Sequence, residues 1–265
     1  MIEKALILSA GQGKRLLPLT ERKAKCLLAF NGRTLLEWQI ACLAEQGIRE
    51  ITVVTGFRAE AIDAMLHART VDGVRVDTLF NPFFQVADNL GSCFIAREMM
   101  RSGGFVLLNG DTLFHPQVFA RARAQARGPI TLTVDRKDRY DDDDMKVQCD
   151  GGRLRAVGKH LSETATNGES IGMTFFSAEG GAMFAAAVEA ALHDPEGLKL
   201  WYLSVIDRLA REHEVRIASI RGLEWCEVDY PKDLAAAGAL TARLWHERTP
   251  RQDGAIPLEQ TGRAM

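Results

Sequence analysis

The stretch ALILSAGQGKRLLPLTERKAKCLL, residues 5–28, decides how the rest of the chain is interpreted. Its first four residues are apolar and predict a buried β-strand, and Gly11 and Gly13 follow where that strand ends. Five basic residues lie in the same segment, so positive charge and little side-chain bulk meet at the end of a strand. Either an anion approaches the backbone here, or the glycines form a tight turn and the basic side chains face solvent.

The composition restricts the kind of anion. The chain has 265 residues, of which 46% are hydrophobic and 26% charged, as expected for a globular protein with one large α/β domain or two small ones. Its formal net charge of −2 argues against a general nucleic-acid binder. The basic cluster is therefore local, and it suits a small anion better than a polymer.

Other features of the chain favour a cytoplasmic protein. No apolar run approaches the roughly 18 residues of a membrane span, and the first residues lack the basic leader and long apolar core of a signal peptide. The five cysteines are scattered without metal-ligand spacing, as is typical of reduced thiols. We expect no membrane partner and no nucleic-acid partner.

Short apolar runs alternate with amphipathic stretches, which predicts βαβ units on a largely parallel sheet. We expect strands at 4–10, 51–56, 74–80, 105–111, 130–135, 171–177, 215–220 and 225–229. We expect helices at 34–46, 58–67, 93–102, 116–126, 180–192 and 199–213, and a last helix from Pro231 to about 246. Thr34 and Glu37 predict a capping box at the start of the first helix.

The pattern changes between about 136 and 170. A polar loop there precedes a short antiparallel hairpin that turns on Asp150-Gly151-Gly152. We assign residues 1–246 to one domain, with 136–170 as an insertion on the acceptor side of the site. The tail, 247–265, has little apolar periodicity, so we expect it to be loosely held or to form an interface, for example in a homodimer.

The glycine segment can bind phosphates through its backbone. The N–H groups of Gly11 and Gly13 can donate to phosphate oxygens, while Arg15 and Lys25 can neutralise them. Two common phosphate loops are excluded, because the chain has no GxxxxGK[ST] and because Leu16 stands where GxGxxG needs its third glycine.

Two carboxylates also follow predicted strands. Asp111 comes after FVLLNG, and Asp229 comes after WCEV, so both are expected at the edge of the sheet where ligands bind. With Pro231 as the first helical residue, Asp229 lies one position outside the cap, which weakens the alternative that it only caps a helix. Two carboxylates beside a triphosphate suit Mg²⁺.

Taken together, these motifs resemble one enzyme family. Gly11-x-Gly13-x-Arg15-Leu16-x-Pro18-Leu19-Thr20, Lys25, Gly110-Asp111 and EVDYPKDL are similar to the nucleotidyltransferases that activate sugar phosphates and phosphocholine. The resemblance covers about residues 5–240. It implies a Rossmann-like three-layer α/β fold with a mostly parallel mixed sheet and a small β-hairpin insertion. It also implies transfer of a nucleotidyl group from a nucleoside triphosphate to a phosphate monoester, with release of pyrophosphate.

The resemblance assigns roles to individual positions. Arg15, Lys25 and Asp111 would be catalytic, and Asp111 and Asp229 would share Mg²⁺. The nucleotide would contact Ala10, Gly11, Gly13, Lys14, Arg15, Lys25, Asn89, Gly91, Ser92 and Gly110. The chain departs from the family pattern at Ala24, where proline is usual, and at Tyr230, where threonine or serine is usual.

The acceptor side is less well defined by the sequence. A phosphate monoester is already a nucleophilic dianion near pH 7, since its second pKa is about 6, so no general base is needed. We favour Lys159 over Lys146 as the ligand of its phosphate, because family members with sugar phosphates use a lysine at the matching place. The candidate acceptor residues are Lys146, Lys159, Glu169, Asp141, Asp144 and Tyr202.

The acidic run from Asp141 to Asp144 suggests what kind of acceptor binds. Such a run is usually a solvated loop, but beside a phosphate site it suits an acceptor that also carries an amine. Aromatic residues at 140, 201, 202 and 225 would then form a cation–π cage or, alternatively, belong to the core.

This pattern most resembles the branch of phosphocholine and aminoalkyl-phosphonate cytidylyltransferases, which use CTP. The alternatives are a sugar-1-phosphate or inositol-1-phosphate acceptor with CTP, UTP or dTTP, and a catalytically silent nucleotide-binding regulator.

Overall fold

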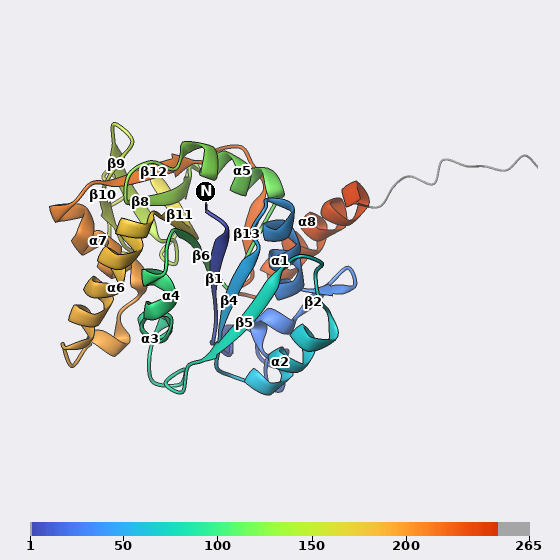
Figure 1. Ribbon diagram of the computed structural model, residues 1–265. Helices are drawn as coiled ribbons and strands as arrows, with labels where there is room; N and C mark the ends of the chain where they lie inside the picture. Colours follow the sequence, from blue (N-terminus) through green and yellow to red (C-terminus); the bar gives the residue numbers. More distant parts are fainter. Residues whose placement is uncertain (1, 249–265) are drawn as a thin grey trace, which may run out of the picture.

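A nine-stranded mixed sheet forms the centre of the computed structural model, which describes residues 2–248 (Figure 1). The strand order is β5-β4-β1-β6-β11-β8-β12-β10-β9. The strands are β1 (Lys4–Ser9), β4 (Glu50–Thr55), β5 (Arg75–Phe80), β6 (Phe105–Asn109), β8 (Ile130–Asp135), β9 (Lys146–Asp150), β10 (Arg153–Val157), β11 (Gly168–Phe176) and β12 (Val215–Ser219).

The two halves of the sheet run differently. Strands β5, β4, β1 and β6 are all parallel, with Leu6 paired to Thr52 on one side and to Leu107 on the other. Beyond β6 the sheet is mixed: β11 is antiparallel to β6 and β8, β12 is parallel to β8, and β10 is antiparallel to β12 and β9. The parallel half therefore presents several carboxyl ends at one edge, where ligands bind in such sheets.

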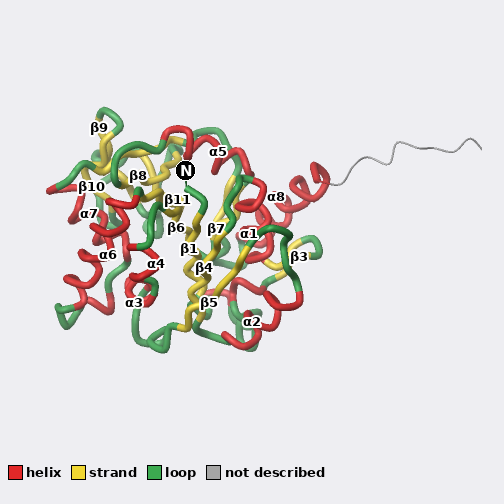
Figure 2. The backbone as a smooth tube through the Cα atoms, in the orientation of Figure 1, coloured by secondary structure: helices red, strands yellow, loops and turns green. Residues whose placement is uncertain are grey.

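Helices cover both faces of the sheet and complete three layers (Figure 2). One face is covered by α1 (Leu35–Glu45), α2 (Ala59–Ala68), α5 (Pro116–Gln125) and α8 (Asp233–Arg248). The other is covered by α3 (Asn89–Ile95), α4 (Arg97–Arg101), α6 (Ala178–Leu192) and α7 (Tyr202–Glu212). The strand side chains are apolar towards both layers, which explains the nearly continuous apolar runs in the sequence.

Several local predictions are confirmed. The capping box of α1 is present, since the Thr34 side chain accepts from the backbone N–H of Glu37 and the Thr34 N–H donates to the Glu37 carboxylate at 2.7 Å. The hairpin β9–β10 turns at Gly151 and Gly152, whose φ angles of 56° and 77° lie in the left-handed region that glycine tolerates.

Several helix boundaries differ from the prediction, among them the start of α7, which lies at Tyr202 rather than at 199. The helix expected at 93–102 is a pair, α3 and α4, and α3 begins earlier, at Asn89. The last helix begins at Asp233 rather than at Pro231. The Asp233 carboxylate accepts the backbone N–H groups of Asp229 and Tyr230, so the chain turns once before the helix starts.

The structure also contains short elements that the sequence did not predict. They are the pair β2 (Ala29–Phe30) and β3 (Arg33–Thr34), the 3₁₀ turns η1 (Lys14–Leu16), η2 (Lys25–Leu27) and η3 (Gly197–Lys199), and β7 (Thr112–Phe114). The predicted late strand at 225–229 is β13 (Trp225–Glu227), and it pairs with β7 in a separate two-stranded ribbon.

Of the predicted tail, residues 247 and 248 end α8, and 249–265 lie outside the described residues. Among the helices within 2–248, none combines the length and the apolar character needed to cross a bilayer.

Candidate active site

A cleft of about 430 Å³ lies at the carboxyl ends of β1 and β6, and the glycine segment forms one of its walls. We call it the nucleotide cleft, after the role that the sequence predicts for its residues. The structure brings nearly all of the predicted nucleotide-binding residues to this cleft. Its lining includes Ala10, Gly11, Gly13, Lys14, Arg15, Lys25, Asn89, Ser92, Gly110, Asp111 and Asp229. Gly91 does not line it. This residue is buried on α3 and packs against Ala87, whose Cβ would lie 2.8 Å from an added Cβ.

The glycines of the cleft serve different purposes. An added Cβ at Gly11 would meet nothing within 4 Å, so the backbone there is open to a ligand. Gly13 has a φ of 75°, and the Lys25 side chain packs so closely that an added Cβ would lie 2.8 Å from Lys25 Cδ. At Gly110 an added Cβ would lie 2.4 Å from the carbonyl oxygen of Leu8. Gly13 and Gly110 therefore allow close packing, and Gly11 keeps a free surface.

Lys25 joins the two carboxylates at the centre of the cleft. Its Nζ donates to Asp111 Oδ2 at 2.7 Å and also to Asp229 Oδ1. Burial by itself would lower the pKa of Lys25, but the two carboxylates together raise it above its usual value. The ammonium group therefore stays charged at neutral pH.

The backbone explains why two residues 118 positions apart meet. Strands β7 and β13 are antiparallel, with Glu227 paired to Thr112, and the Val228 N–H donates to the Asp111 carbonyl at 3.1 Å. This ribbon places the residue before β7 beside the residues after β13. The separate ribbon, which the sequence did not predict, thus aligns Asp111 and Asp229.

These two carboxylates fit a divalent cation that is shared with a substrate. Both lie within hydrogen-bond distance of one nitrogen, and Asp111 Oδ1 is buried without a hydrogen-bond partner among the described residues. Within residues 2–248, no group of three or more His, Cys, Asp or Glu side chains is arranged to hold a metal. Mg²⁺ typically takes one or two protein carboxylates and completes its shell with phosphate oxygens and water.

Arg15 lies beside this centre, on η1. Its guanidinium pairs with Asp229 Oδ2 at 3.1 Å and lies 4.9 Å from the centre of the Tyr230 ring. Burial would lower the pKa of Arg15, but the Tyr230 hydroxyl and the nearby carboxylates raise it. A permanently charged fork at this place is suited to phosphate oxygens.

A second cleft, of about 630 Å³, continues past Asp229 towards the loop 141–144. We call it the acceptor cleft, after the role that the sequence predicts for several of its residues. Glu169 on β11 forms part of the wall of this cleft, and the residue is only 5% exposed. Lys137 Nζ donates to Glu169 Oε2 and to Asp144 Oδ2, each at 2.7 Å. Burial raises the pKa of Glu169 to about 7, although Lys137 opposes the shift.

The sequence analysis did not single out Lys137 or Glu227, which also line this cleft. Burial, and then the charges of Asp111 and Asp229, raise the pKa of Glu227 to about 8. The strand period of two gives no clear signal for Glu227, because its neighbour Cys226 lines the same cleft as Trp225, Glu227 and Asp229 do. Lys137 lies in a loop, where periodicity gives no signal.

Three predicted acceptor residues do not line this cleft, and two of them, Tyr202 and Lys146, lie in the interior. Tyr202 is 0% exposed, and its ring meets Phe184 edge-on in the core, so the expectation that it contacts the acceptor is corrected. Lys146 is also buried, and its Nζ donates to the backbone carbonyl of Lys159 at 3.0 Å. Lys146 therefore supports the backbone of Lys159 and does not offer its charge to the cleft.

Lys159 occupies a bridging position. Its side chain is 22% exposed, its Nζ pairs with Asp143 Oδ1 at 3.0 Å, and it lies 5.0 Å from the centre of the Trp201 ring. Trp201 lines the nucleotide cleft, whereas Asp143 lines the acceptor cleft. Lys159 lines neither cleft itself, but its side chain contacts one residue of each.

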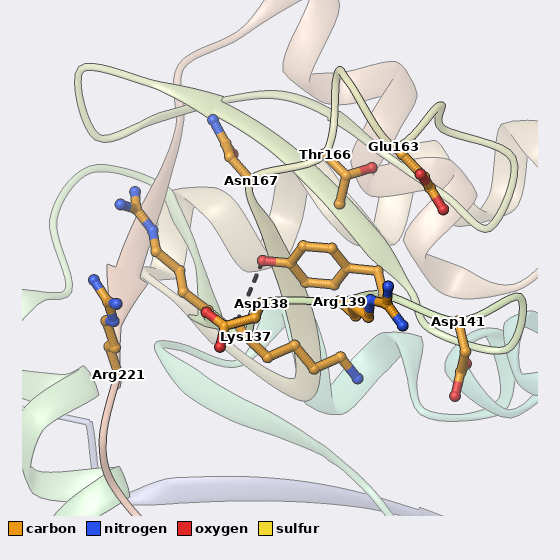
Figure 3. A pocket seen from close by; sticks show the side chains of 10 residues that line it. Lys137, Asp138, Arg139, Asp141, Glu163, Thr166, Asn167 and Arg221 are labelled. Carbon is orange, nitrogen blue, oxygen red and sulfur yellow. Dashed lines mark hydrogen bonds between the residues drawn. The ribbon is translucent and has the colours of Figure 1, made fainter.

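A third cavity, of about 1060 Å³, lies beside the same segment of chain (Figure 3). Tyr140 lines this cavity, and its hydroxyl accepts from the backbone N–H of Lys137 at 3.4 Å. Trp225, in contrast, lines the acceptor cleft and donates to Asp135 at 2.8 Å. The four aromatic residues considered above therefore do not form one cage.

A family model described as nucleotidyl transferase matches residues 4–242. A bifunctional IPC transferase and DIPP synthase of Aquifex aeolicus is 28% identical over 89% of this chain and 51% of its own length. A CMP-5'-(3-aminopropyl)phosphonate synthase of Streptomyces rubellomurinus is 30% identical over 87% of this chain and 37% of its own. The chain thus spans about half of the first relative and 37% of the second. A choline-phosphate cytidylyltransferase of Streptococcus pneumoniae is 26% identical over 87% of this chain and 94% of its own.

Solved structures have the same fold. The inositol-1-phosphate CTP transferase from T. maritima superposes with a TM-score of 0.78 at 20% identity, over 92% of this chain and 96% of its own. The CTP:phosphocholine cytidylyltransferase from Streptococcus pneumoniae superposes with a TM-score of 0.73 at 21% identity, over 91% of this chain and 100% of its own. At these identities the likeness shows the fold alone.

Proposed function

This chain belongs to the nucleotidyl transferase family, and we propose that it transfers the cytidylyl group of CTP to a small phosphate or phosphonate monoester that also carries a positive charge. Phosphocholine or a related amino-alcohol phosphate is the acceptor that we favour. The products are a CDP-linked compound, or its CMP-linked phosphonate counterpart, and pyrophosphate.

On the nucleotide side, each charged residue has a task in this proposal. Arg15 binds the β- and γ-phosphates, and Lys25 stabilises the charge that develops on the reacting phosphates. Asp111 and Asp229 would hold Mg²⁺, which supplies further positive charge to the phosphates when it is bound. The open backbone at Gly11 receives the nucleotide.

The reaction itself requires little from the protein beyond alignment. An acceptor oxygen attacks the α-phosphorus, a new P–O bond forms, and the bond to the bridging oxygen breaks, so that pyrophosphate leaves with the electron pair. The acceptor oxygen carries no proton near pH 7, so no side chain has to remove one. Cations that bring two anions together are therefore the main requirement.

The observation that carries the acceptor proposal is a pair of carboxyl groups in the second cleft, of which Glu169 is buried and Glu227 is half-buried. The pKa of Glu169 is raised to about 7, and that of Glu227 to about 8, mainly by burial. A cation bound between them would stabilise their ionised forms, which burial penalises. A neutral polyol offers no such compensation. An ammonium group at one end of the acceptor, with its phosphate held by Lys159, fits this charge pattern.

The choice of CTP is supported by the names of the relatives. The choline-phosphate enzyme is a cytidylyltransferase, and the phosphonate relative is named as a synthase of a CMP-linked aminopropylphosphonate. Both relatives combine a cytidine nucleotide with an acceptor that contains nitrogen. A nitrogen-bearing acceptor is also what the acidic cleft favours.

Pyrophosphate release from a panel of substrates tests the proposal. The protein would be incubated with Mg²⁺, each of the four common ribonucleoside triphosphates or dTTP, and each of several phosphate monoesters. We expect the fastest release with CTP and phosphocholine, phosphoethanolamine or 2-aminoethylphosphonate. Faster release with a sugar-1-phosphate would contradict the acceptor proposal. Binding of CTP without pyrophosphate release from any pair would favour a regulatory protein.

Inositol-1-phosphate is the second candidate. The Aquifex relative named as an IPC transferase covers 89% of this chain, and the T. maritima inositol-1-phosphate CTP transferase superposes with a TM-score of 0.78. The same panel separates the two candidates, because inositol-1-phosphate has no cationic group and would not benefit from ionised Glu169.

A further inference from the structure

One carboxylate, that of Asp143, connects the two clefts. Its Oδ2 lies 3.4 Å from Arg15 Nη1, and its Oδ1 lies 3.0 Å from Lys159 Nζ. Arg15 is the cation that we assign to the triphosphate, and Lys159 is the one that we assign to the acceptor phosphate. A single side chain from the acidic loop thus pairs with a cation from each side of the site.

Tyr230 completes the connection. Its hydroxyl donates to Asp143 Oδ2 and accepts from Arg15 Nη1 at 3.0 Å, and its ring lies under the guanidinium at 4.9 Å. Tyr230 therefore contacts Arg15 through both its hydroxyl and its ring.

Asp143 carries a full negative charge at neutral pH. Hydrogen bonds from Tyr230 and Lys159 lower the pKa of its carboxyl group below the usual value, and the charge of Arg15 adds to the effect. Its side chain is 47% exposed, on a loop that contacts Arg15 across 128 residues of sequence. A charged, exposed carboxylate of this kind can be displaced by a stronger anion without disturbing the core.

We propose that Asp143 is an internal substitute for a substrate phosphate, which competes with the triphosphate for Arg15, and that Tyr230 is a positioning residue that keeps Arg15 in place when Asp143 is displaced. This inference rests on the proposed function, because Arg15 must bind the triphosphate. When the triphosphate displaces Asp143 from Arg15, the loop loses one of its contacts. Asp143 can then also release Lys159, which becomes free to bind the acceptor phosphate.

The test compares two variants that should change CTP affinity in opposite directions. Asp143→Asn removes the competing charge, so the Kd for CTP with Mg²⁺ should fall about threefold at low salt, the scale of a surface ion pair. Tyr230→Phe removes the hydroxyl that Arg15 contacts, so the Kd should rise about threefold, the scale of one hydrogen bond. Isothermal titration measures both. Asp138→Asn, an exposed carboxylate on the same loop, is the matched control and should leave the Kd unchanged.

Inorganic tripolyphosphate is the second probe, because it engages the phosphate contacts without base or ribose. Asp143→Asn should strengthen its binding by a similar factor, and the gain should shrink at high salt. A kinetic readout separates positioning from folding: Tyr230→Phe should raise the KM for CTP more than it lowers kcat.

The outcomes distinguish the two claims. If the wild type binds CTP and Asp143→Asn binds it equally well or more weakly, competition by Asp143 is wrong and the proposed function stands. If both variants weaken binding, the contacts only stabilise the loop, and the inference is again overturned. If the wild type binds neither CTP nor tripolyphosphate, the proposed function fails and the inference fails with it.

Discussion

The nucleotide cleft and the acceptor cleft share Asp229 but are built by opposite means. The nucleotide cleft lies at the end of parallel strands, and it consists of open backbone at Gly11 and of cations such as Arg15 and Lys25. The acceptor cleft lies over the mixed half of the sheet, and the carboxyl groups of the buried Glu169 and the half-buried Glu227 form part of its wall.

This difference shows how one fold can keep a reaction and vary the substrate. The first cleft stabilises a polyanion through groups that are charged in every state of the protein. The second contains acids whose pKa values lie near neutrality, so its charge depends on what is bound there and on pH. Changes in the first cleft should therefore affect turnover with every acceptor, and changes in the second should affect only the choice of acceptor.

Loss of the charge on Asp111 should give the largest effect. Asp111→Asn keeps the shape of the side chain but weakens the metal site, so kcat should fall at least ~100-fold with every acceptor. Asp77→Asn, on the exposed edge of β5, is the control and should keep normal rates. A near-normal kcat in Asp111→Asn, measured by pyrophosphate release, would show that the metal assignment is wrong.

The two functions of glycine in the nucleotide cleft can be separated next. Gly110→Ala places a Cβ 2.4 Å from the Leu8 carbonyl oxygen, so the free energy of unfolding should fall by about 2 kcal/mol. Gly11→Ala meets nothing within 4 Å, so stability should hardly change while the KM for CTP rises. Chemical denaturation and steady-state kinetics measure the two effects. Equal losses of stability would remove the distinction.

Neutralising Glu169 should weaken binding of the acceptor and leave binding of the nucleotide nearly unchanged. In Glu169→Gln the KM for phosphocholine should rise about tenfold, because a buried charge that faces the cation is lost. The KM for CTP should stay within about twofold. Glu163→Gln, on the wall of the third cavity, is the matched control and should change neither value. A larger change for CTP than for phosphocholine would contradict the separation.

Glu169→Gln should also change how the stability of the protein depends on pH. The pKa of Glu169 is raised in the folded protein to about 7 from a usual 4.5, so the folded state binds the proton more tightly. Stability therefore falls as pH rises between these values, and the cost of the ionised group is full above pH 7. The difference in free energy of unfolding between Glu169→Gln and the wild type should therefore shift by about 1–2 kcal/mol in favour of the variant from pH 5 to pH 8. A pH-independent difference in thermal unfolding would rule this out.

The sequence predicted the nucleotide cleft better than the acceptor cleft, for a physical reason. Backbone sites need glycines and strand ends, which are local patterns, so Gly11, Gly13, Arg15, Lys25 and Asp111 could be identified directly. The alignment of Asp111 with Asp229 needed the β7–β13 ribbon, whose pairing is not local.

The acceptor cleft depends on burial, which a sequence does not record. Tyr202 and Lys146 had the right chemistry for the site, but packing places both in the interior. Lys137 and Glu227 became visible only when the loop and the ribbon were seen together. Strand direction was similarly hard to predict, since the apolar run of β11 looks like a parallel strand although its neighbours β6 and β8 run antiparallel to it.

The central claim is that the second cleft selects a cation. The most direct measurement compares kcat/KM, with CTP and Mg²⁺, for phosphocholine and for its uncharged carbon analogue 3,3-dimethylbutyl phosphate, which has nearly the same shape. We predict a preference of at least about tenfold for phosphocholine in the wild type and the loss of most of that preference in Glu169→Gln. Equal kcat/KM values for the two acceptors in the wild type would contradict the claim.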